Sequence, residues 1–354
     1  MRVPAVLLAL SLIAVLAVHA RASSEPTTDG AVLIYANAAG AAVLVDGKRR
    51  GEMPARTDSG FRVLLPAGNH TIELKRDGRN VFYEFRASAS VSVQPDTLLP
   101  IAMPALEPSL LPDARSRVDK IVASFLPQMA TIPQGTYQMG GREEEDSSDN
   151  EFPRHEVVLA KPFLMQKYNV TFEQWDACVA DQGCTHIPND ENRGRGAVHV
   201  FNVNWQEARD FAAWISRRLD RTCRLPSEAE WEYAVRGGSQ AKFFWGDGTQ
   251  QMSDYVSMGI DHPSSVPPKM PNPFGLFAMV GGMTEWVADC WHSTYAGAPT
   301  DGSVWGAPSC TARVVRGGFW DADPWYWRSA RRSTMIARNR YNYVGFRLSC
   351  ASKE

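Results

Sequence analysis

The sequence lacks an excess of charge of either sign, and it lacks the short motifs of several common enzyme classes. Its 37 lysines and arginines nearly balance its 39 aspartates and glutamates, which gives a formal net charge of −2. No global field therefore draws the chain to nucleic acid or to an anionic membrane. There is no Gly-x-Ser-x-Gly elbow and no phosphate-binding loop. Four histidines of the C-terminal part show no metal-ligand spacing: His186, His199, His262 and His292.

A long apolar run occurs only at the start of the chain. Residues 1–22 begin with Met1 and Arg2, continue through the apolar stretch Val3–Val18 and end in small residues around Ala20. This pattern predicts a cleaved secretory signal peptide. A single transmembrane anchor is the alternative, although spanning requires roughly 20 apolar residues. No cysteine follows the run, which argues against a lipoprotein anchor, so we expect a periplasmic or secreted protein with no integral membrane span after cleavage.

Cysteine is absent before Cys178, and all six cysteines lie between that residue and Cys350. An even number of cysteines in an exported chain predicts disulfide bonds before metal or redox chemistry. Six cysteines allow 15 connectivities, and proximity along the chain is the basis for choosing among them. It favours the pairs Cys178–Cys184 and Cys290–Cys310, which leaves Cys223–Cys350 to close the domain.

Residues 31–103 read as a small β module that follows a polar linker. Val43–Gly47 contains a strand and an Asp-Gly turn, and Arg62–Leu74 contains two strands joined by a turn. The spacing of these short motifs resembles a PEGA-type β-sandwich module, and this resemblance implies a surface-associated or spacer role. A passive stalk is the simpler alternative. Asp46 and His70 read as turn and strand residues rather than catalytic ones.

Residues 104–127 read as a linker with one short helix, Asp113–Phe125, and a larger domain follows at about residues 128–351. Three helix starts are predicted by side chains that can cap the first turn, namely Thr171, Asn204 and Ser227. The tryptophans of these helices fall on apolar faces, which predicts that they belong to the core.

Four blocks of the larger domain are typical of one family. Arg224–Tyr233 is followed by Gly281–Val287, by Arg313–Trp320 and by the closing Gly345–Arg347. On these residues the chain resembles the formylglycine-generating-enzyme, or sulfatase-modifying-factor, family. The resemblance implies an α+β architecture, with a C-type-lectin-like fold that contains much irregular loop, beside the small N-terminal β-sandwich.

The chemistry that the resemblance implies is oxidation of a substrate cysteine by oxygen at a copper ion held by two cysteines. Soft thiolate ligands select Cu(I). Counted from Gly317–Trp320, the two positions that match the family's cysteines are Ala322 and Trp327, and Thr311–Ser349 contains no cysteine. We therefore expect no catalytic residues of that kind and no resident cofactor.

Calcium is the other ion that the resemblance implies, through a Gly-Asn-x-x-Glu-Trp block. Glu285 and Trp286 match that block, but Gly282 stands where the family has asparagine. This removes one oxygen ligand from a cation that takes six or more. Glu285 stays a weak calcium candidate. The acidic run Glu143–Glu151 lacks the ligand spacing of a calcium loop and reads as a solvated loop.

Large aromatic and basic side chains are dense after Gly318, and such side chains often dominate binding energy. Three consecutive aromatic residues, Trp325–Trp327, cannot all point inward, so at least one should be exposed. In the related family this stretch lies along the substrate groove. The predicted ligand-binding residues are Trp320, Asp321, Asp323, Trp325, Tyr326, Trp327, Arg328 and Arg331.

The leading hypothesis is an exported binding module that does not oxidise its ligand and that recognises an envelope protein, a peptide or a glycan. An oxidoreductase of the sulfatase-modifying type that uses different residues is one alternative. A structural scaffold that binds nothing small is the other. Nucleic acid is not an expected partner, because the chain has no basic excess and carries an export signal.

Overall fold

The computed structural model describes residues 29–56, 58–143, 147–256, 269–307 and 309–352, which form two compact units. The predicted signal peptide and His262 lie outside the described residues. The first unit contains the described residues up to Lys75 together with Ala87–Leu106, and the second contains Arg76–Arg86 and the chain from Glu107 onward. Among the described residues, no helix is long and apolar enough to cross a membrane.

The strands of the N-terminal region form two sheets. One sheet has the order β4-β1-β7 and the other has the order β3-β2-β5-β6-β8. Their bounds are β1 Asp29–Tyr35, β2 Ala42–Val45, β3 Lys48–Glu52, β4 Phe61–Pro66, β5 Gly68–Arg76, β6 Tyr83–Val93, β7 Leu98–Ala102 and β8 Glu107–Leu110.

Alternating residues of these strands point into one core, as a half-buried strand requires. Val32, Val43 and Ile72 are completely buried in it. The predicted Asp-Gly turn joins β2 and β3, and both Asp46 and Gly47 have positive φ, at 50° and 75°. Two positive φ values are what a two-residue hairpin turn needs. The sandwich is thus present, while its PEGA-type assignment stays a prediction.

The second unit contains the helices α1 Ala114–Phe125, α2 Phe172–Ala180, α3 Trp205–Leu219, α4 Glu228–Arg236 and the short α5 Met252–Tyr255. All three predicted caps are confirmed as capping boxes, in which Thr171, Asn204 and Ser227 accept from the third helical residue. Each box satisfies amide groups that the first turn of a helix leaves without partners.

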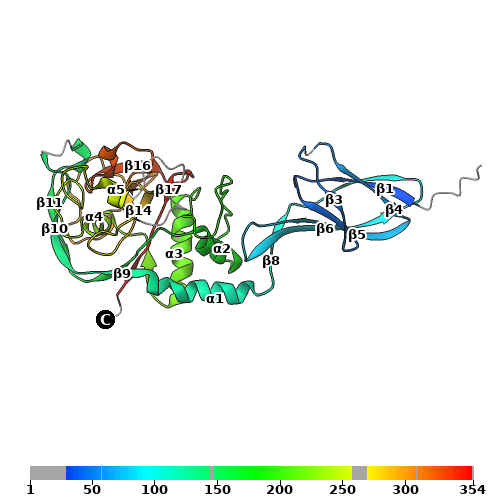
Figure 1. Ribbon diagram of the computed structural model, residues 1–354, viewed down its shortest axis with the longest axis horizontal. Helices are drawn as coiled ribbons and strands as arrows, with labels where there is room; N and C mark the ends of the chain where they lie inside the picture. The colour runs from blue at the N-terminus through cyan, green and yellow to red at the C-terminus, as the bar shows by residue number, and fades with distance from the viewer. Residues whose placement is uncertain (1–28, 57, 144–146, 257–268, 308, 353–354) are drawn as a thin grey trace, which may run out of the picture. The chain divides into compact units, whose positions relative to one another are not determined.

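Helices α1, α2 and α3 pack against one another (Figure 1). The predicted linker helix is therefore an integral part of the larger unit, because Val118 and Phe125 of α1 lie in its core. The helix tryptophans lie in the same core as predicted, with Trp175 completely buried and Trp214 at 2% exposure.

Short strands complete the second unit in three small sheets, ordered β10-β11, β13-β18-β12-β9 and β16-β15-β14-β17. Their bounds are β9 Met129–Ile132, β10 Gly135–Met139, β11 His155–Leu159, β12 Phe163–Gln166, β13 Cys223–Arg224, β14 Thr284–Cys290, β15 Ala312–Arg316, β16 Arg332–Ile336, β17 Val344–Gly345 and β18 Ser349–Ala351. Short 3₁₀ helices lie in the loops, among them η1 Leu126–Gln128, η3 Asp149–Glu151 and η5 Pro324–Trp327. The strand-rich α+β architecture is the one that the sequence predicts.

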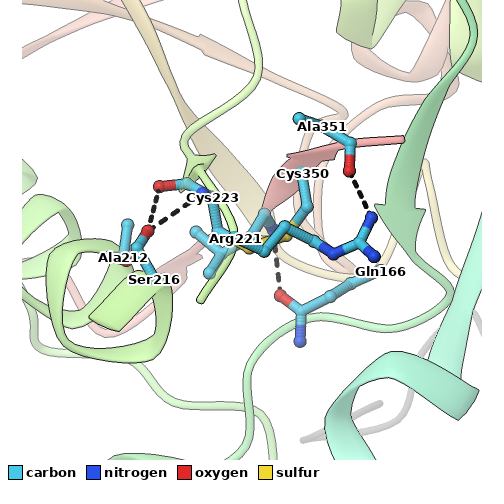
Figure 2. Close-up of a disulfide and its surroundings, with 8 residues drawn as sticks. Gln166, Ala212, Ser216, Arg221, Cys223, Cys350 and Ala351 are labelled. Carbon is cyan, nitrogen blue, oxygen red and sulfur yellow. Dashed lines mark hydrogen bonds between the residues drawn. A yellow bond between two sulfur atoms is a disulfide. The ribbon is translucent and has the colours of Figure 1, made fainter. Parts of the chain in front are cut away.

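Disulfides join the six cysteines in the three predicted pairs, Cys178–Cys184, Cys223–Cys350 and Cys290–Cys310. Figure 2 shows the second of these, which links β13 to β18 across 127 positions of sequence. Ser216 of α3 holds β13 in place, since its Oγ accepts from the backbone N–H of Cys223 at 2.9 Å. This arrangement closes the domain at its C-terminal end.

Candidate functional site

The candidate site begins where β15 ends in a pair of glycines. Gly317 and Gly318 both have positive φ, at 94° and 62°. A Cβ atom on Gly317 would lie 2.6 Å from the carbonyl oxygen of Met279, and one on Gly318 would lie 2.8 Å from a ring carbon of Trp327. Only glycine fits both the backbone conformation and these close approaches. The pair therefore allows the chain to turn tightly into the aromatic segment.

A cavity of about 130 Å³ lies beside this turn. Its wall comes from β14, β15 and the turn that follows β15. The rest of the wall comes from η5, from β16 with the residue before it, and from the segment before β17. The lining residues include Gly318, Phe319, Tyr326, Arg331, Met335 and Tyr343. Phe319 and Tyr343 contact each other with ring centroids 4.9 Å apart. Ligand pockets for whole small molecules usually measure about 300–1,000 Å³, so this cavity suits one side chain or terminal group of a larger ligand.

A buried ion-pair network forms the base of the site. Arg316, the last residue of β15, donates to Glu228 at 2.7 Å and to Glu232 at 2.6 Å. Arg332 binds the Glu228 carboxylate through both Nε and Nη2, at 2.7 and 2.8 Å. Burial alone would raise the pKa of Glu228, but the guanidinium of Arg332 and then that of Arg316 outweigh it and hold the pKa below its usual range. Glu228 and Glu232 thus join α4 to the end of β15 through the side chain of Arg316.

The structure distributes the predicted ligand-binding residues over three environments. Tyr326 is 41% exposed, as required by the prediction that one of the three consecutive aromatic residues faces outward. Asp321 and Asp323 are exposed as well, although Asp323 Oδ1 accepts from the backbone N–H of Trp325 and so caps η5. Trp320 is half-buried against the core. Tyr326 and Arg331 are the two predicted residues that reach the cavity.

Trp327 and Arg328 are buried, with 1% and 0% exposure, and neither lines the cavity. The indole N–H of Trp327 donates to the carbonyl of Phe319, and Arg328 donates to both oxygens of Glu151 at 2.7 Å. These two residues therefore support the site from inside. Arg328 faces inward because it pairs with Glu151, which lies 177 positions away in the sequence and which the local sequence does not reveal.

Glu151 corrects the interpretation of the acidic run as a solvated loop. Its side chain is completely buried, and its carboxylate pairs with Arg328 across 177 positions of sequence. Residues 144–146 of the run lie outside the described residues. The end of this segment thus anchors the aromatic segment to the rest of the unit.

The residues present do not fit a copper ion held by two thiolates. Ala322 has no ligand atom, and the Trp327 nitrogen is a donor that is already bonded. All six cysteines of the chain are in disulfides, and Cys310 and Cys350, which flank the segment, belong to different pairs. No thiolate is available beside the cavity.

Glu285 does not fit a calcium ion either. Its carboxylate is completely buried, and it accepts from Arg347 at 2.7 Å and from the indole of Trp231 at 2.8 Å. Calcium requires six or more oxygen ligands that are free to coordinate. Within the described part of the chain, no group of three or more acidic, histidine or cysteine side chains is placed to hold a metal.

Asp289 is a buried carboxylate that sequence reasoning missed. It lies on β14 and accepts from the backbone N–H groups of Glu228 and Trp305, at 2.7 and 2.8 Å. Burial, and next the charge of Glu228, raises the pKa of Asp289 to about 7. It ties the start of α4 to the loop between Cys290 and Cys310.

The raised pKa predicts a pH dependence of stability. Between about pH 4 and pH 7 the folded protein holds a proton on Asp289 that the unfolded chain has released. The Asp289 contribution to the free energy of unfolding should therefore fall as pH rises, by about 1.4 kcal/mol per pH unit. Urea unfolding at pH 5 and pH 6.5 measures the free energy of unfolding of the wild type and of Asp289→Asn. The wild type should lose stability between these pH values by this additional amount per pH unit. The exposed Asp254→Asn is the control, and an equal slope in the Asp289→Asn protein would contradict the assignment.

A second and larger groove, of about 800 Å³, is lined by residues that include Lys161, Arg224 and Asp301. Its Arg224 is paired with Glu230 at 2.7 Å. None of the predicted ligand-binding residues lines this groove. The cavity beside Gly318 is the better candidate because the glycine turn and the aromatic segment converge on it.

These features define an α+β domain of short strands and long loops in which a Gly-Gly turn and an arginine–glutamate core support a small aromatic cavity. The chain belongs to the family of the sulfatase-modifying factor enzyme 1-like domain, whose model matches residues 117–351. It is similar to the formylglycine-generating enzyme of Streptomyces coelicolor, with 33% identity over 286 residues, covering 62% of this chain and 88% of that enzyme.

Two further relatives extend the comparison. The solved structure of PvdO from Pseudomonas aeruginosa has 30% identity and a TM-score of 0.59, and the match covers 63% of this chain and 94% of that one. The inactive C-alpha-formylglycine-generating enzyme 2 of Bos taurus is 26% identical over 252 residues, which cover 54% of this chain and 76% of that protein. The family therefore contains proteins named as active enzymes and one named as inactive.

The cavity also contains residues that the sequence-based prediction did not select. Phe319, Ser333, Met335 and Thr284 all line it. Phe319 belongs to the block Arg313–Trp320, so the sequence pattern could have identified it. The other residues come from strands whose pairing brings them to the turn, and no local pattern marks them.

Proposed function

We propose that the larger unit is a non-oxidative binding module of an exported protein and that it takes one residue of a peptide into the cavity beside Gly318. The observation that carries this proposal is the chemical state of the cysteines. All six form disulfides, and the resemblance places Ala322 and Trp327 at the two positions of the family's copper ligands. Without a thiolate pair, the family's oxidative route has no ligands for its metal.

The size and lining of the cavity favour a peptide as the ligand. A volume of about 130 Å³ accommodates a single side chain. The aromatic rings of Phe319, Tyr326 and Tyr343 offer apolar contact area with little conformational entropy to lose. Export through the predicted signal peptide, together with the three disulfides, is consistent with a partner at the cell envelope.

An oxygen-consumption assay tests the proposal against the oxidoreductase alternative. The purified chain is supplied with copper and a cysteine-containing sulfatase-motif peptide, and the enzyme of Streptomyces coelicolor is the positive control. We expect oxygen uptake no greater than that without protein. Peptide-dependent turnover by this chain would overturn the proposal.

A binding assay on peptide arrays separates a binding module from a scaffold. Trp325→Ala combined with Tyr326→Ala should weaken capture of any bound peptide at least about tenfold, because one aromatic side chain at a binding centre contributes on the order of 2 kcal/mol. Ile336→Ala is the matched control, since this side chain is 46% exposed on β16. Unchanged capture by the double variant would favour the scaffold. On a parallel glycan array, capture of glycans without capture of any peptide would favour a glycan ligand.

A further inference from the structure

Arg331 lines the cavity, and its guanidinium lies against two aromatic rings. Its guanidinium carbon lies 4.0 Å from the ring centroid of Trp325 and 5.0 Å from that of Tyr326, and its side chain is 14% exposed. A guanidinium in contact with aromatic rings keeps its N–H edges available for hydrogen bonds in a fixed plane. The rings thus orient the cation at the border of the cavity.

The hydrogen bonding of Arg331 within the protein is incomplete. Nη1 donates to Ser148 Oγ at 3.1 Å and lies 3.7 Å from Glu151 Oε1. Nε is buried, and within the described ranges it has no hydrogen-bond partner. A guanidinium has five N–H donors, and a buried donor without an acceptor is energetically unfavourable. Within the described residues, Nε therefore has no acceptor, and Nη2 lies next to it on the same edge of the guanidinium.

Arg331 shares its ion-pair partner with a second arginine. Glu151, its ion-pair partner, is bound more closely by Arg328, with both distances at 2.7 Å. Burial lowers the pKa of Arg331, and the positive charge of Arg328 lowers it further against the attraction of Glu151. Among the described residues, the Glu151 carboxylate thus pairs with two guanidinium groups, and Arg331 is the more distant of the two.

We infer that the Nε–Nη2 edge of Arg331 binds a carboxylate of the ligand, while the ligand's neighbouring side chain fills the cavity beside Phe319 and Tyr343. The inference rests on the proposed function, because it names the charge that the bound peptide carries. A carboxylate has two oxygens in the geometry of a guanidinium edge and a single negative charge. A dianionic phosphate would call for more than this one edge. The carboxylate belongs to a free C-terminus or to an acidic side chain.

The test uses acetylated tripeptides in which each natural amino acid is placed at the last position. Each peptide is made with a free C-terminal carboxylate, with a C-terminal amide, and as an amide with aspartate at the middle position. Calorimetry should show that a carboxylate form binds about 10- to 100-fold more tightly than its neutral amide, as a charged two-point hydrogen bond predicts. Comparison of the two acidic forms identifies the source of the carboxylate.

Variants place the effect on Arg331. Arg331→Met should remove the preference for the carboxylate form, and Arg331→Lys, which keeps the charge but loses the planar edge, should reduce it. Arg338→Gln is the control, because Arg338 is exposed on the same segment. If the Met variant does not fold, as judged by near-ultraviolet circular dichroism, the Lys variant alone decides the question.

Each outcome separates the two claims. Equal affinity of acid and amide peptides for the wild type, or an unchanged preference in the Lys variant, would overturn the carboxylate inference and leave the binding function in place. Absence of binding by every peptide would overturn both. Binding of glucuronate without binding of any peptide would keep the carboxylate chemistry and overturn the peptide class.

Discussion

Replacement of Glu228 by glutamine is expected to lower the free energy of unfolding of the larger unit by about 3–5 kcal/mol, which is typical for loss of one partner of a buried ion pair. The carboxylate faces Arg316 and Arg332, and both arginine side chains are completely buried. Glutamine keeps the shape of glutamate but leaves these two cations with less compensating charge. Chemical denaturation followed by tryptophan fluorescence measures the change.

The matched control for this experiment is Glu156→Gln. Glu156 is exposed on β11, so its replacement should change the free energy of unfolding by no more than about 0.5 kcal/mol. If Glu228→Gln were as mild as this control, the arginine–glutamate network would not be the support that holds the Gly317 turn. Since Arg316 ends β15 directly before that turn, the variant should also weaken peptide binding at the cavity.

Loss of the Cys223–Cys350 disulfide is expected to have the second large effect. Replacing both cysteines by alanine should lower the free energy of unfolding by about 5 kcal/mol. The bond closes a loop across 127 positions, and the entropy that the unfolded chain gains when such a bond is removed increases with loop length. The pair Cys178–Cys184 spans 6 positions and offers an internal comparison. Its double replacement should cost about 2–3 kcal/mol.

Denaturation of the two double variants under identical non-reducing conditions compares the two losses in free energy of unfolding. Equal losses would contradict the loop-length argument and would indicate that side-chain packing around the cysteines contributes more to stability than loop closure does. The strand pair β13–β18 should still form without the disulfide, because Ser216 continues to accept from the amide at position 223. A peptide-binding assay should therefore show an intact cavity at temperatures below unfolding.

Local signals in the sequence predicted much of the fold. Thr171, Asn204 and Ser227 each start a helix because a side-chain oxygen and the third residue of the helix satisfy the amides of the first turn. Such interactions span three residues and can be read from the chain directly. The Asp46–Gly47 turn is equally local, since two residues that tolerate positive φ define it.

The candidate site was predictable only in part. Tyr326 and Arg331, both predicted to bind a ligand, line the cavity, and the exposure of Tyr326 agrees with the expectation that one of three consecutive aromatic residues faces outward. Trp327 and Arg328 were selected with them, although both face inward. Arg328 pairs with Glu151, which belongs to a distant segment and which no spacing rule connects to it.

The amino-acid order alone was enough to predict the family resemblance, the cysteine pairs and the helix starts, because these predictions use near neighbours, motif spacing or proximity along the chain. The cavity, the burial of Glu151 and Asp289, and the position of Arg331 Nε, which has no acceptor among the described residues, emerge only when distant segments come together. Strand β16 brings Met335 to the turn at Gly318, and the 3₁₀ helix η3 brings Glu151 to Arg328. Side-chain direction and charge balance at the site follow from these long-range contacts, which local sequence patterns do not encode.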